Sequence, residues 1–416
     1  MPMEVPSSTE RDTMAVTTNA ATTVDRHWLG DAALDRLRDQ ADPLADNAVG
    51  AYFWSLDQTE PADLFARLAG HTHLPAERQD PAIRTFFEDA AGVPSWADPD
   101  KVRRGQEFFI ESAGHHFSAL YLASLPTAYA AATGVQVLDV TARLRTDAER
   151  RVNETAQLLM DVSGPAALEA GGLGVQRLLH VRLMHAAVRW LIGNDPAVDH
   201  VADTAPPFEP APKPEDDPIW SASWGRPVNQ EDLVATFLTF TTVVYDVFDR
   251  VGVDYTDDQI DDHLHMWRLI AHWLGVDPAI VPVDRPTAAQ LQRSIWARQH
   301  APSAAGVAMT AALLEQADDR LPRLLAAMIP TAMRRLNGDL VCDMIGVPPP
   351  NWTRFRLGAM SDLWRVLTFG RRPNAAMRRL SARTGRLMIE ALVDAPREGE
   401  RPAFEIPAHL AGRLGR

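Results

Sequence analysis

The stretch VRLMHAAVRW (residues 181–190) sets one histidine among leucine, valine and alanine, with an arginine before it and another after it. Residues three, four and seven positions apart share a face of an α-helix. Arg182, His185 and Arg189 therefore lie on one face, and Leu178 extends that face as an apolar stripe. The pattern predicts a largely apolar helix that carries an imidazole between two cations.

Two interpretations fit this helix. In the first, His185 is a core histidine, and Arg182 and Arg189 pair with acids elsewhere in the fold. In the second, the neutral imidazole binds a haem iron, apolar residues contact the macrocycle, and the two guanidinium groups meet the propionates. The spacing alone favours the first. His180 points to another face, so it and His185 are not a natural pair of ligands for one ion.

Helical spacing extends through most of the chain. Alanine, leucine and arginine dominate, and alternating runs of β-branched residues are scarce. Long stretches such as 99–131, 173–193, 229–251 and 318–346 each accept a continuous helical pattern. We therefore predict an all-α fold that forms a single large helical domain.

The expected domain covers residues 26–416. Residues 1–25 are polar and predict a disordered N-terminal lead. The segment ADTAPPFEPAPKPEDDP (202–218) is proline-rich and acidic, which predicts a surface loop that crosses the domain. No local pattern assigns residues 350–416, or an oligomeric state.

Charge and composition argue against several kinds of partner, cofactor and membrane topology. The net charge of −14 disfavours nucleic acid and anionic membranes as partners. Cys342 is the only cysteine, so neither an intrachain disulfide nor an iron–sulfur cluster can form within one chain. No apolar run is long enough to span a membrane. The N-terminus carries no export signal, so we expect a cytoplasmic protein.

A second polar cluster lies on the helix predicted in DAERRVNETAQLLMDV (147–162). Arg151, Glu154 and Thr155 share a face, which continues into apolar residues. Taken alone, Arg151 and Glu154 form an ordinary surface pair. Opposite a haem iron, however, the arginine and the hydroxyl could bind dioxygen or peroxide, and the carboxylate could move protons.

These two helices together resemble the haem-binding core of the latex clearing protein family of rubber oxygenases. The resemblance rests on Arg151-x-x-x-Thr155 followed thirty residues later by RLMHAAVR. It extends from about residue 40 to 350 through the ordered segments DPLAD (42–46), VPSWAD (93–98), LASLPTAYAAATG (122–134), GRPVNQEDLVATFLTF (225–240) and HMWRLIAHWLGV (265–276).

The resemblance implies a globin-like, haem-binding helical core in which His185 is the proximal ligand of a b-type haem, with Arg151 and Thr155 on the distal side. Where the family has a lysine that can reach the iron, this chain has Glu154. The family's distal acid has no secure match, and Glu154, Asp139 or Asp147 could replace it. Arg182 and Arg189 are expected at the propionates on spacing, not on the resemblance.

The sequence thus predicts a haem-dependent oxygenase that uses dioxygen on a hydrophobic alkene or terpenoid-like substrate. An electron donor is left open as a further partner. A haem peroxygenase with an Arg151–Glu154 pair and a non-catalytic haem sensor or carrier remain alternatives.

A third alternative is an isoprenoid synthase that holds magnesium through Asp257, Asp258 and Asp261. Thr256 and Gln259, however, favour a capping box there. In the same segment, His265 and His272 share a helical face. Two turns, roughly 10 Å, separate them, which is too far for one ion.

Overall fold

The computed structural model describes residues 30–55, 81–143, 148–193, 220–321 and 323–349. The helices in these ranges are α1 (Asp31–Arg38), α2 (Pro43–Ser55), α4 (Pro81–Ala90), α5 (Pro99–Glu111), α6 (Ala113–Ala119), a π-helical turn (Leu120–Ser124), α7 (Leu125–Ala130), α8 (Gly134–Arg143), α9 (Ala148–Ser163), α10 (Leu173–Gly193), a 3₁₀ turn (Ala222–Trp224), α11 (Gln230–Phe240), α12 (Thr242–Val251), α13 (Asp257–Trp273), α14 (Arg285–Gln299), α15 (Ala304–Arg320), α16 (Arg323–Ala326), α17 (Ile329–Asn337) and α18 (Asp339–Met344).

The predicted all-α fold class is confirmed. The described ranges contain no β-strand, and their single β-bridge joins Ala131 to His300. The predicted N-terminal lead (1–25) and proline-rich loop (202–218) lie outside these ranges, and the single domain over 26–416 stays a prediction. None of the helices described is both long enough and apolar enough to cross a membrane.

Three of the stretches predicted as continuous helices are interrupted. Residues 318–346 contain the end of α15 and the whole of α16, α17 and α18, and Gly338, with φ 83°, separates the last two. Residues 229–251 form α11 and α12, which meet at Thr241 with φ −117° and ψ −86°. The hydroxyls of Thr241 and Thr242 donate to the carbonyls of Phe237 and Leu238, four residues earlier. Such side-chain bonds compete with the backbone ladder and bend helices.

The stretch 99–131 is divided in the same way. α5 ends at Glu111, and α6 starts at Ala113. Between them Ser112 caps α5, and its hydroxyl donates to the Phe108 carbonyl at 2.6 Å. A π-helical turn then links α6 to α7. Helical periodicity alone predicts neither interruption, because both keep the apolar residues facing inward.

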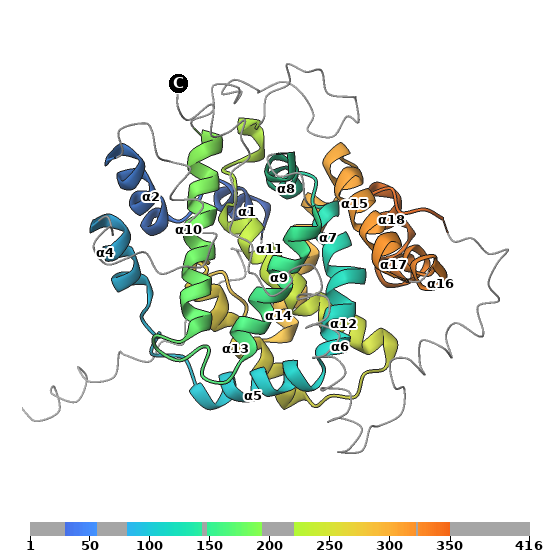
Figure 1. The fold of residues 1–416 in the computed structure, drawn as a ribbon, viewed down its shortest axis with the longest axis horizontal. Coiled ribbons are helices and arrows are strands. Elements are labelled where there is room, and N and C mark those ends of the chain that lie inside the picture. Colours follow the sequence, from blue (N-terminus) through green and yellow to red (C-terminus); the bar gives the residue numbers. More distant parts are fainter. Residues whose placement is uncertain (1–29, 56–80, 144–147, 194–219, 322, 350–416) are drawn as a thin grey trace, which may run out of the picture.

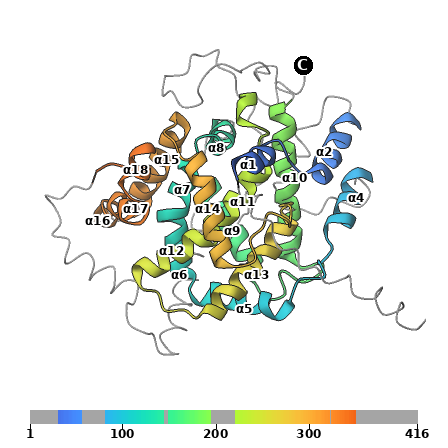
Figure 2. The same ribbon diagram turned by 180° about the vertical axis from the view of Figure 1, so that it is seen from behind.

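α10 and α9 pack side by side (Figures 1 and 2). α10 packs against α2, α9 and α13. α2 and α4 lie on one side of the molecule and α15 to α18 on the opposite side, an arrangement that both views show. The described helices share one large cluster of buried side chains that extends from Leu34 to Val347.

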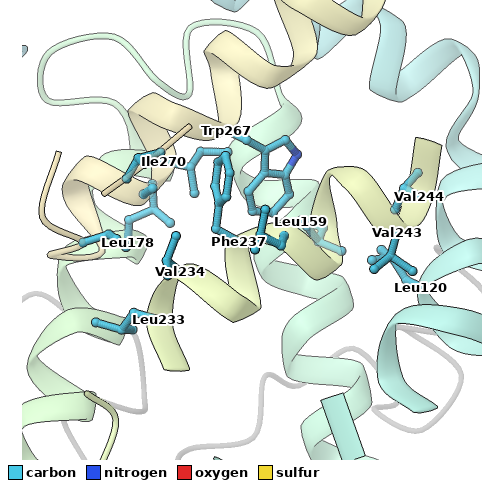
Figure 3. Packing of buried hydrophobic residues seen from close by; sticks show 14 of the residues in the cluster. Leu120, Leu159, Leu178, Leu233, Val234, Phe237, Val243, Val244, Trp267 and Ile270 are labelled. Atoms are coloured by element: carbon cyan, nitrogen blue, oxygen red, sulfur yellow. The ribbon is translucent and has the colours of Figure 1, made fainter. Parts of the chain in front are cut away.

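Figure 3 shows the middle of this core. Leu159 of α9, Leu178 of α10, Phe237 of α11 and Trp267 of α13 project into a common space. The Trp267 ring stacks on Phe240 with centroids 4.6 Å apart. Because α9, α10, α11 and α13 all contribute to this space, the core fixes the position of α10 relative to its neighbours.

α5 and α13 approach each other closely at Gly105. A Cβ atom placed there would lie 2.7 Å from the Asp262 carbonyl oxygen and 2.9 Å from the Met266 Cβ. Only glycine leaves room for this crossing. Asp98 caps the N-terminus of α5 by accepting from the amides of Asp100 and Lys101, with Pro99 at the first helical position.

A buried carboxylate joins three helices that are distant in sequence. Glu231, on the first turn of α11, is fully inaccessible to solvent. It accepts from Arg38 of α1 at 3.1 Å, from Arg298 of α14 at 3.1 Å and from the Gln299 amide at 2.8 Å. The paired cations and the amide offset the cost of burying its charge.

Candidate functional site

His185 lies in the middle of α10, half-buried. Leu178, Leu183, Ala186 and Ala187 of the same helix are buried at 2% exposure or less. A helix that is apolar on most of its circumference belongs inside a protein. The imidazole is therefore held on a well-packed helix among apolar side chains, as the sequence predicts.

The first flanking arginine pairs with an acid at the start of α2. Arg182 donates through Nε to Asp42 at 2.5 Å and through Nη2 to the other carboxylate oxygen at 2.8 Å. Asp42 is 4% exposed. The guanidinium carbon also lies 5.6 Å from the ring centroid of Phe86 on α4. This two-pronged pair fixes α10 against the start of α2.

The second flanking arginine makes a similar contact one turn further along α2. Arg189 is 7% exposed and donates from Nε to Asp46 at 2.7 Å and from Nη1 to the Val228 carbonyl at 3.1 Å. Both arginines thus meet acids within the segment DPLAD (42–46). These acids are the partners that the first interpretation of the helix anticipates, and the role of Arg182 and Arg189 at haem propionates stays a prediction.

The sequence did not identify these two aspartates as arginine partners, although a signal was present. Asp42 and Asp46 are one turn apart at the start of α2, and Arg182 and Arg189 are two turns apart on α10. Two acids and two cations, each pair on one helix face, are the pattern of a paired helix interface. The segment DPLAD, one of the motifs that carry the family resemblance, thus also supplies the acids of both ion pairs.

His180 lies on another face of α10, as predicted. Its Nδ1 contacts the Gln176 carbonyl at 2.6 Å, and its ring lies 5.3 Å from that of Phe87 on α4. His180 and His185 therefore face different neighbours, which makes His180 a natural comparison residue for His185.

The second predicted cluster lies on α9, which packs against α10. Thr155 is exposed, whereas Leu159 and Val162, one and two turns further along, are buried at 3% and 1% exposure. The face that carries Thr155 therefore runs from the surface into the core. The helix includes Arg151 and Glu154, but their side chains lie outside the described part of the structure.

The aspartates proposed for magnesium have a structural role instead. Asp257 and Asp258 occupy the first turn of α13, where their charge opposes the positive end of the helix dipole. Thr256 and Gln259 form the predicted capping box. Within the described ranges, no group of three or more histidine, cysteine, aspartate or glutamate side chains is arranged to hold a metal ion, Asp261 included. The isoprenoid synthase alternative loses its site.

The structure brings together a buried histidine pair that the sequence did not predict. The rings of His116 and His263 lie 4.8 Å apart and are almost completely buried. His263 contacts the Tyr245 hydroxyl through Nδ1 at 2.8 Å and accepts from the Trp267 indole at 3.2 Å. Burial lowers the pKa of His116 to about 3 and the pKa of His263 well below its usual value. Both are neutral core residues at pH 7.

The donor set around His185 suits a haem. The macrocycle supplies its own four nitrogens, so the protein needs to add one neutral imidazole within an apolar environment. A metal ion bound by side chains alone would need several ligands together, and the described residues offer no such cluster. His185, half-buried on an apolar helix, matches the simpler requirement.

Comparison with known proteins places the chain among oxygenases. Residues 112–371 match the family described as ER-bound oxygenase mpaB/B'/Rubber oxygenase, catalytic domain. A rubber oxygenase of Streptomyces sp. (strain K30) is 26% identical over 268 residues, which cover 64% of this chain and 60% of that relative. The solved structure of latex clearing protein LCP in the closed state superimposes with a TM-score of 0.66 and 24% identity, over 89% of this chain and 95% of that chain.

Proposed function

Because this chain belongs to the family of mpaB/B' and rubber oxygenase catalytic domains, we propose that it is a haem-dependent oxygenase of a hydrophobic alkene. The observation that carries this proposal is the position of His185, half-buried on an apolar helix that packs against α9. The match spans 60% of the length of the rubber oxygenase relative, so its activity is part of the proposal.

In this proposal the imidazole of His185 holds the iron of a b-type haem. When bound, the haem supplies an iron centre that can activate dioxygen. The ion pairs of Arg182 with Asp42 and of Arg189 with Asp46 hold α10 against α2, in one rotation about its axis and one position along it. Both arginines therefore act as positioning residues for His185, and each is a candidate for contact with a haem propionate.

Three residues of α9 would work on the opposite side. Arg151 would donate hydrogen bonds to the oxidant, the Thr155 hydroxyl would orient it, and Glu154 would hold or release a proton. The placement of Thr155 at the exposed end of a face that leads to Leu159 supports this assignment, because an oxidant and a substrate must both enter from solvent.

The proposed substrate is a hydrophobic molecule with a carbon–carbon double bond, which the protein would convert to carbonyl products with dioxygen. The apolar side chains of α9 and α10, Leu159 and Leu178 among them, favour such a molecule over a polar one. The relative's name, rubber oxygenase, points to the same chemical class. We suggest a small terpenoid alkene as the first substrate to assay.

The decisive experiment is an absorption spectrum of the purified protein. We expect a Soret band that is lost in His185→Ala and retained in His180→Ala, the matched control on another face of the same helix. Glu154→Ala should change the turnover rate and keep the Soret band. A folded wild-type protein without a Soret band, or loss of the band only in His180→Ala, would refute the proposal.

The oxidant is identified by turnover under controlled conditions. With a terpenoid alkene, we expect product formation that requires dioxygen and takes up its atoms, measured with ¹⁸O₂ and mass spectrometry. Product that forms without dioxygen but with added peroxide would instead indicate a peroxygenase that uses Arg151 and Glu154.

A further inference from the structure

A group of basic side chains on α13 lies beneath the indole of Trp96, in the loop between α4 and α5. The Trp96 ring centroid is 4.7 Å from the guanidinium carbon of Arg268, and 5.6 Å and 6.4 Å from the rings of His265 and His272. All four side chains are half-buried. We call these four residues the Trp96 cluster.

Arg268 is distinctive because it has no carboxylate partner among the residues that the structure describes. Its Nε is buried and makes no hydrogen bond to them, and burial lowers its pKa without an opposing acid. The neighbouring cations differ, since Arg104 is paired with Asp262 at 2.6 Å and Arg182 with Asp42. A guanidinium stays charged at every physiological pH, so Arg268 brings an uncompensated positive charge into a partly dry site.

His265 adds a hydrogen-bond donor beside this charge. Its Nε2 accepts from the backbone amide of Asp98 at 2.9 Å, so in the neutral ring the proton must be on Nδ1. Burial lowers the pKa of His265, which keeps the ring neutral at pH 7. The Nδ1–H group of His265 is therefore available to donate to a ligand.

The described acids near the cluster are already engaged. Asp98 accepts from the amides of Asp100 and Lys101 at the start of α5, and Asp262 pairs with Arg104. His272 interacts with the Gly92 carbonyl, which holds the loop in place. The Trp96 cluster thus presents one fixed positive charge, one neutral donor and one aromatic face.

We propose that the Trp96 cluster binds the carboxylate of a small organic molecule, held by Arg268 and His265. The guanidinium edge offers two parallel donors that match the two oxygens of a carboxylate. A single positive charge suits a monoanion better than a phosphate dianion, and Trp96 can cover the apolar part of the ligand next to the charged group. This inference rests on the described residues of α13 and its loop, independently of the haem.

The test is isothermal titration of the full-length protein with hexanoate. We expect saturable binding of hexanoate, no binding of hexan-1-ol, which has the same chain length without the charge, and weaker binding of inorganic phosphate. Arg268→Gln should abolish the binding. Arg268→Lys should weaken it at least ~10-fold, because lysine keeps the positive charge but lacks the two parallel N–H donors of the guanidinium. Arg84→Gln, at an exposed arginine of α4, should bind as wild type.

Two results would overturn the proposal: equal heats with hexanoate and hexan-1-ol in the wild-type protein, or unchanged hexanoate binding in a folded Arg268→Gln. The wild-type comparison decides the matter even if that variant does not fold. A further arm identifies the natural source of the carboxylate. If loading with haem blocks hexanoate and loading with haem dimethyl ester does not, the ligand is a haem propionate; if neither blocks it, the ligand is a separate molecule.

Discussion

Asp42 shows how much depends on single contacts in this protein. The carboxylate is 4% exposed, and both of its oxygens accept from Arg182. Because both charges lie largely out of solvent, removing either one leaves the other without a compensating charge. The same contact joins the start of α2 to the helix that carries His185, so its loss affects both stability and the position of the imidazole.

We predict that Arg182→Gln destabilises the protein by about 3–5 kcal/mol, because it leaves the Asp42 charge buried and unpaired. The matched control is Arg103→Gln, which breaks an exposed pair with Glu107 and should cost about 0.5 kcal/mol or less. Urea unfolding followed by circular dichroism measures both. Equal free energies of unfolding for the two variants would contradict this account.

At the scale of single residues, the sequence predicted which residues share a face of α10 but not which acids pair with them. The 3.6-residue period placed Arg182, His185 and Arg189 together, and the structure agrees. The acids that pair with the two arginines lie 140 and 143 positions away in the chain. Such pairing depends on how α2 packs on α10, which local periodicity does not contain.

At the scale of elements, small residues and side-chain hydroxyls decide how helices meet. Gly105 allows α5 to cross α13 closely, and Thr241 divides a long apolar stretch into α11 and α12. The hydrophobic pattern predicted helices in both regions and missed the break. A pattern of buried positions survives a bend of this kind, so it cannot reveal one.

We predict that Gly105→Ala lowers stability by about 1–3 kcal/mol, since the new methyl group meets the Asp262 carbonyl and overpacking of this kind is costly. Gly114→Ala is the control. It lies in α6, where nothing stands within 4 Å of the position that the alanine methyl would take, so alanine should raise helix stability by up to about 1 kcal/mol. Thermal unfolding should move in opposite directions for the two variants, and a shift in the same direction would be inconsistent with a steric conflict at Gly105.

For the whole molecule, the buried histidines determine how stability responds to acid. In the folded protein, burial lowers the pKa of His116 to about 3 and of His300 to about 4, and lowers that of His263 well below its usual value. In the unfolded chain the pKa of each is about 6.5. Between about pH 6.5 and pH 4 the unfolded chain thus binds more protons, and folding becomes less favourable as the pH falls.

We predict a loss of about 1.4 kcal/mol per pH unit for each of these histidines in that range. Buried Asp232, whose pKa rises to about 6, reduces this loss of stability, because it takes up a proton more readily in the folded protein than in the unfolded chain. Urea unfolding at about pH 7, 6 and 5 gives the slope. His116→Phe should reduce the slope by the share of one histidine, and an unchanged slope would count against the buried neutral state.

Composition and periodicity were sufficient for the fold class, and the ordered motifs were sufficient for the family. The capping box predicted at Thr256 and Gln259, which places Asp257 and Asp258 in the first turn of α13, is confirmed as well. The sequence could not show that His116 and His263 meet in the core. That contact joins α6 to α13, two helices far apart in the sequence, so no local pattern contains it.

The carboxylate of Glu231 links the first described helix to the middle and later parts of the chain. Because α1, α11 and α14 all bond to this one group, none of them can open without exposing its charge. Their backbone amides should therefore exchange with deuterated water as one unit, and α1 should be protected far beyond what a helix of 8 residues would achieve alone.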